Sequence, residues 1–73
     1  MTKEEAELLV PGDLVLYDNP TIRKDFSGVL EILTDFSWWA KAGEPGLFKV
    51  QVLNPGERYG MITNLSYSYM TKL

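Results

Sequence analysis

Aromatic and carboxylate side chains are the groups in this sequence that could do chemistry, because histidine and cysteine are both absent. Without these two residue types the chain cannot build a Ser-His-Asp or Cys-His nucleophilic centre, a Cys/His zinc site or a disulfide. No D-x-D-x-D-G calcium loop and no glycine-rich phosphate loop is present, and a chain of 73 residues offers little room for a buried cleft. We therefore predict that the protein is not an enzyme and that it holds no cofactor and no metal.

The aromatic residues point instead to binding, since two Trp, four Tyr and three Phe occur in this short chain. Trp38 and Trp39 are adjacent, so in an extended segment one enters the core while the other faces solvent or a partner. Tyr17 and Tyr67 each combine an apolar ring with a polar end, which suits a wet interface. We predict a partner-binding patch formed by Trp38, Tyr17 and Tyr67. The alternative interpretation is that both tryptophans are structural.

The charge pattern argues against a strong hold on nucleic acid, because the net charge is −3 and only Arg23-Lys24 forms a basic pair. Lys49 and Arg58 flank one predicted hairpin and would have to converge to contact phosphate. The apolar run Leu8-Leu9-Val10 is far too short for a signal peptide or a membrane span. We expect a complete, small cytoplasmic gene product with no membrane partner.

The elements that must position these side chains are a short helix and five strands. Thr2 as N-cap and Glu5 three residues later predict a helix over residues 2–10, which Pro11-Gly12 ends. Alternating apolar residues and turn signals then predict strands at residues 13–18, 27–35, 47–53, 58–63 and 65–70. The predicted core consists of Val15, Leu30, Ile32, Phe48, Val50 and Val52.

Five short strands joined by Gly/Pro turns predict an all-β fold, a small closed barrel or a two-sheet sandwich. Closing the sheet would remove exposed strand edges, which matters in a chain without disulfides. We assign residues 1–11 to a short N-terminal helix with its lead-in and residues 12–73 to a single small β-barrel domain.

Short motifs in this sequence resemble two groups of small barrels. Gly12-Asp13-Leu14-Val15 followed by Gly28-Val29 is similar to the opening of Src-homology-3-like (SH3-like) barrels of the KOW and Tudor type. Leu16-Tyr17-Asp18 looks like the core of the Ala-Leu-Tyr-Asp-Tyr motif of classical SH3 domains, and Trp38-Trp39 looks like their tandem tryptophans. Leu30-Glu31-Ile32-Leu33 and Gly46-Leu47-Phe48 add further short matches, although no Pro-Ser-Asn-Tyr follows and Asn19 replaces the second motif tyrosine.

The resemblance implies a five-stranded SH3-like barrel with a groove in which Trp38 approaches Tyr17 and an extended, proline-rich peptide docks. Our first hypothesis is a non-catalytic protein-binding module, a small accessory or regulatory protein that contacts another protein or an extended peptide. The alternative is a nucleic-acid-associated barrel of the KOW or Tudor type, and a third interpretation is a structural homodimer. Lys and Arg around Trp38 and Tyr17 would favour nucleic acid, whereas a neutral or acidic groove would favour protein.

The tryptophan pair gives a testable asymmetry. Trp38→Ala should leave the fold nearly intact and weaken partner binding by about 2 kcal/mol or more, the usual threshold for an interface anchor. Trp39→Ala should instead unfold the barrel through a core cavity. Thermal melts and co-purification of both variants measure this, and loss of folding in both would make the pair structural.

Overall fold

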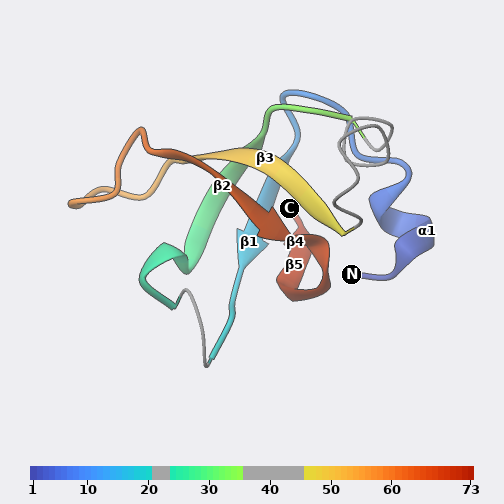
Figure 1. The fold of residues 1–73 in the computed structure, drawn as a ribbon, viewed down its shortest axis with the longest axis horizontal. Coiled ribbons are helices and arrows are strands. Elements are labelled where there is room, and N and C mark those ends of the chain that lie inside the picture. Colours follow the sequence, from blue (N-terminus) through green and yellow to red (C-terminus); the bar gives the residue numbers. More distant parts are fainter. Residues whose placement is uncertain (21–23, 36–45) are drawn as a thin grey trace.

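The chain forms one antiparallel sheet with a very short N-terminal helix (Figure 1). A computed structural model describes residues 1–20, 24–35 and 46–73. The elements in chain order are α1 (Lys3–Ala6), β1 (Leu14–Tyr17), the 3₁₀ helix η1 (Lys24–Phe26), β2 (Gly28–Ile32), β3 (Leu47–Val52), β4 (Ile62–Ser66), the 3₁₀ helix η2 (Tyr67–Tyr69) and β5 (Met70–Lys72). The predicted all-β class with a short N-terminal helix is confirmed.

The sheet has the strand order β4-β3-β2-β1-β5, so β1 to β4 pair in sequence and β5 returns to pair with β1. The register places Leu30 between Val15 of β1 and Val52 of β3. Successive strand residues point to opposite faces of a sheet, and the side chains of one face form the buried core. One hydrophobic cluster includes all six predicted core residues, and its members are Ala6, Leu9, Val15, Tyr17, Phe26, Leu30, Ile32, Phe48, Val50, Val52, Leu65 and Met70.

The helix α1 begins with the predicted capping box. The Thr2 hydroxyl oxygen accepts a hydrogen bond from the Glu5 N–H at 3.2 Å, and the Glu5 carboxylate accepts one from the Thr2 N–H at 2.8 Å. Two hydrogen bonds lower the pKa of Glu5 below its usual value. The bond with the Thr2 backbone N–H has the larger effect, and the bond with the Thr2 hydroxyl has the smaller one. Among the described ranges of the chain, no helix is long and apolar enough to cross a membrane.

The prediction that this helix extends over residues 2–10 is wrong, because α1 ends at Ala6. The Glu7 N–H still bonds to the Lys3 carbonyl four residues back. The N–H groups of Leu8 and Leu9 bond to carbonyls three residues back, at Glu5 and Ala6, which tightens the chain beyond α1. This turn buries both Ala6 and Leu9 in the core cluster. Tertiary packing therefore decides where the helix stops, as is usual for helices too short to persist alone.

The last two predicted strands are also displaced. Residues 58–60 form a turn in which the Met61 N–H bonds to the Arg58 carbonyl, so β4 begins at Ile62 rather than at residue 58. The segment predicted as a strand over residues 65–70 contains η2, and only three residues form β5. The Ser66 side chain accepts a hydrogen bond from the Ser68 N–H at 3.2 Å and caps η2, which ends the strand geometry there.

The Asn54 side chain extends the pairing of β2 beyond the end of β3. Its Oδ1 accepts a hydrogen bond from the Val29 N–H and its Nδ2 donates one to the Ser27 carbonyl, both at 2.9 Å. The amide group thus occupies the place of a backbone peptide unit opposite Gly28. A Cβ at Gly28 would overlap this amide, and Gly28 also has φ of +127°, which only glycine adopts readily.

This arrangement predicts unequal effects of alanine at two glycines with similar φ angles. Gly56 has φ of +138° and nothing within 4 Å of a built Cβ, so Gly56→Ala should cost only the backbone strain, about 1–3 kcal/mol. Gly28→Ala should cost roughly 2 kcal/mol more, because it also displaces the Asn54 amide and its two hydrogen bonds, at about 1 kcal/mol each. Urea denaturation measures the difference, and equal losses in the two variants would show that the Asn54 contact contributes nothing.

Candidate functional site

An aromatic pair lies where β1 meets η2. The ring centroids of Tyr17 and Tyr69 are 6.2 Å apart and the ring planes make an angle of 69°, an edge-to-face contact. Tyr17 ends β1 opposite Met70 of β5, and its side chain is buried because it shares the inward face with Val15. Tyr69, by contrast, is 43% exposed. The buried ring therefore supports the exposed one.

Hydrogen bonds fix the chain on both sides of this pair. The buried Asn19 donates from Nδ2 to the Tyr17 hydroxyl at 3.3 Å, and the Asp18 N–H donates to the Tyr69 carbonyl at 3.0 Å. Asp18 and Pro20 are themselves exposed. The chain after Tyr17 thus presents an exposed acidic residue and an exposed proline, and its backbone is bonded to η2 at Asp18.

The two predicted tyrosines occupy different places. Tyr17 lies beneath the surface instead of facing a partner directly, whereas Tyr67 is half-buried and packs against the core cluster. The Tyr67 N–H donates to the Gly46 carbonyl at 2.9 Å, and its ring lies 3.6 Å from a Cβ built on Gly46. The described residues contain a ring contact of Tyr17 with Tyr69 but none with Tyr67. Trp38, the third predicted residue, lies outside the described residues, as does Trp39.

Tyr69 is the residue that sequence reasoning missed. The alternating Tyr-Ser-Tyr pattern resembles a strand, and a strand would place Tyr67 and Tyr69 on one face. The 3₁₀ helix instead separates them, leaving Tyr67 against the core and Tyr69 against Tyr17. The position of Tyr17, however, follows from sequence: with period two, a buried Val15 requires an inward Tyr17.

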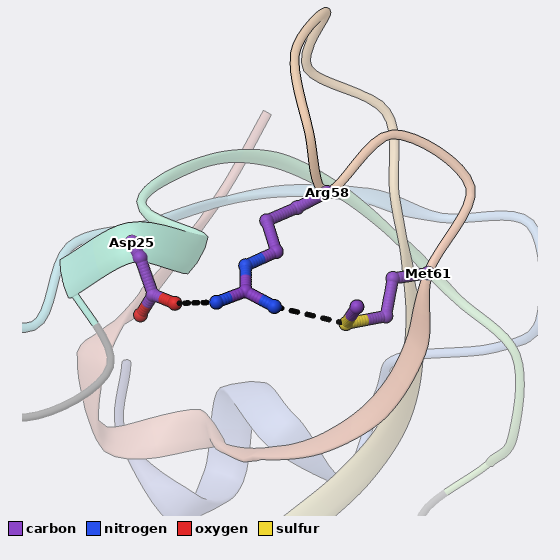
Figure 2. A network of polar contacts seen from close by, with 3 residues as sticks. All are labelled: Asp25, Arg58 and Met61. Atoms are coloured by element: carbon purple, nitrogen blue, oxygen red, sulfur yellow. Dashed lines mark hydrogen bonds and ion pairs between the residues drawn. The ribbon is translucent and has the colours of Figure 1, made fainter.

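Arg58 is held by three neighbours, of which Figure 2 draws Asp25 and Met61. Its Nη2 lies 2.8 Å from Asp25 Oδ2, and Nη1 lies 4.0 Å from the Met61 sulfur. The guanidinium carbon is 5.3 Å from the ring centroid of the buried Phe26, a cation–π distance. The contacts link the β3–β4 hairpin to η1. A phosphate would have to compete with the Asp25 carboxylate for this guanidinium group.

Within the described part of the chain, no group of three or more acidic side chains lies close enough together to hold a metal ion. Comparison with protein-family models, curated proteins and solved structures finds no significant match to this chain. The Tyr17–Tyr69 surface is therefore the candidate site on geometry alone.

The Arg58 contacts predict a small, salt-dependent contribution to stability. Both partners of the ion pair are about half exposed, with side-chain exposures of 45% and 49%, so Arg58→Gln should cost only about 1 kcal/mol. Added salt should narrow the gap between wild type and variant, because exposed ion pairs are screened. Urea denaturation at low and high ionic strength measures this. Glu57→Gln, at an exposed neighbouring charge with no ion pair among the described residues, is the matched control. If the difference in stability between wild type and Arg58→Gln does not depend on salt, the effect comes from packing on Phe26.

Proposed function

We propose that this protein is a non-catalytic binding module that holds an extended segment of another protein against the surface around Tyr69. The observation that carries the proposal is the 43% exposed Tyr69 ring, packed edge-to-face on the buried Tyr17. A tyrosine already ordered by a neighbouring ring loses little side-chain entropy on binding, which is why such residues serve as interface anchors. A small accessory or regulatory protein of the cytoplasm fits this role.

We also propose that the sheet curls into an SH3-like barrel. The strand order, with β5 returning to β1 after a 3₁₀ helix, is compatible with such a barrel. Leu65 of β4 and Met70 of β5 come from opposite edges of the sheet and yet belong to the same hydrophobic cluster. Strong curvature is the simplest way to bring both edges to one core. It would also place the end of β1 and η2 on one rim.

An extended, proline-containing peptide is the partner that this surface fits best. Proline rings pack on aromatic faces, and a polyproline II segment needs little additional ordering. The exposed carboxylate of Asp18 beside the Tyr69 contact would favour a basic residue in the peptide. Trp38 remains the predicted second wall of this groove. Nucleic acid is less well supported, since Asp18 is acidic and Arg58 is engaged by Asp25.

Titration with a synthetic proline-rich peptide containing arginine tests the proposal. Binding should shift the backbone NMR signals of Asp18, Asn19 and Tyr69, and Tyr69→Ala should weaken binding at least tenfold, or about 1.4 kcal/mol. Tyr59→Ala is the matched control, because Tyr59 is 65% exposed on the β3–β4 turn and should not affect binding.

Circular dichroism verifies that both variants remain folded. Shifts caused by a single-stranded oligonucleotide but not by the peptide would favour the nucleic-acid alternative. Equal peptide affinity of wild type and Tyr69→Ala would contradict the assignment of this surface.

A further inference from the structure

The strand β4 lies at one end of the sheet, and its outer edge has no strand partner among the described residues. Among the described strands it pairs only with β3. The Val52 N–H bonds to the Met61 carbonyl and the Tyr67 N–H bonds to the Gly46 carbonyl, which fixes the alternation of the ladder between them. Thr63 and Leu65 therefore direct their backbone groups to β3. The backbone N–H groups of Ile62, Asn64 and Ser66 point away from β3, toward the open edge.

The five residues of β4 themselves carry none of the usual protections against pairing, although a bulge precedes them at Gly60 and Met61, which both bond to Val52. Natural proteins place Lys, Pro or bulges on exposed edge strands or make those strands very short. The five residues of β4 include no charged residue, proline or glycine, and the surrounding residues 59–71 are entirely uncharged. The opposite edge of the sheet differs, because β5 has only three residues and carries Lys72. The absence of protection is thus specific to β4.

We propose that the β4 edge pairs antiparallel with β4 of a second copy of this chain, around a twofold axis at Asn64. In this register the two Asn64 residues exchange backbone hydrogen bonds, and the Ser66 N–H donates to the Ile62 carbonyl of the other copy. Each strand meets its own sequence reversed, so the pairing is self-complementary and brings no like charges together.

The Asn64 side chain supplies a second, independent observation. Its Oδ1 is buried and has no hydrogen-bond partner among the described residues, a costly condition for an amide oxygen. Asn64 lies at the centre of the proposed pair, where the two side chains stand opposite each other on the same face. Rotation of each amide would then allow hydrogen bonds between the two copies. A strand from a foreign protein would satisfy this group only if it offered a matching donor at that position.

Ile62 contributes the apolar part of the interface. Its side chain is 55% exposed at the start of β4, and in the proposed register it packs beside Ser66 of the second copy. An interface formed by one pair of five-residue strands is small, so the dimer should be weak and should form with rising protein concentration.

Sedimentation velocity over a range of concentrations tests the proposal with two proline variants. Wild type should shift from a mass of 8.3 kDa toward twice that value. Asn64→Pro removes an N–H that points to the open edge and not to β3, a position where edge strands tolerate proline, and it should raise the dimer dissociation constant at least tenfold. Lys72→Pro is the matched control, because the Leu73 N–H bonds to the Leu14 carbonyl and the Lys72 N–H therefore faces the opposite open edge.

A further variant keeps the test decisive if Asn64→Pro fails to fold. Asn64→Glu places a carboxylate opposite Lys49 within its own sheet but opposite a like charge in the dimer, so it should also remain monomeric. In wild type, hydrogen exchange of the Asn64 and Ser66 amides should slow as concentration rises. A wild type that stays monomeric at every soluble concentration would overturn the proposal. So would a folded Asn64 variant that still dimerises, or a dimer abolished by Lys72→Pro alone.

Discussion

The contact between the Asn54 amide and the backbone around Gly28 is the constraint on which the arrangement of the sheet depends. The strand β3 ends at Val52, and the Leu53 N–H still bonds to the Val29 carbonyl, but the next two bonds of β2 are made by a side chain. The chain can therefore turn away after β3, while the first residues of β2 keep their hydrogen bonds through the Asn54 side chain. The β3–β4 connection begins at this point, and its Arg58 lies over the Phe26 ring and pairs with Asp25.

Features with a strong local cause could be predicted from the sequence. The capping box of Thr2 and Glu5 and the alternation of Phe48, Val50 and Val52 specify their structure within a few residues. The ends of elements could not be predicted in the same way. The helix stops at Ala6 because burial of Leu9 favours a tighter turn, and η2 interrupts a pattern that alternates like a strand.

The candidate site also combines a feature set by the local sequence with one set by a contact between distant parts of the chain. The sequence predicts Tyr17 in the binding patch, whereas the alternation along β1 buries its side chain on the face of Val15. That alternation contains nothing about which later residue reaches Tyr17. The partner, Tyr69, is brought there by the pairing of β5 with β1, a contact between distant parts of the sequence. Likewise, Asn54 looks like an ordinary turn residue before Pro55. Its role becomes visible only when residues 27–29 lie beside it.

The return of β5 to β1 has a consequence for the order of folding. The pairs β2–β3 and β3–β4 join neighbouring segments, whereas Tyr17 meets Met70 across most of the chain. Closing so large a loop carries a greater entropic cost than forming a hairpin, so the local hairpins have the kinetic advantage. During synthesis, β1 can complete its pairing only when residues 70–72 have emerged from the ribosome. Until then its outer edge, and the Tyr17 side of the core, stay accessible to chaperones and to other nascent chains.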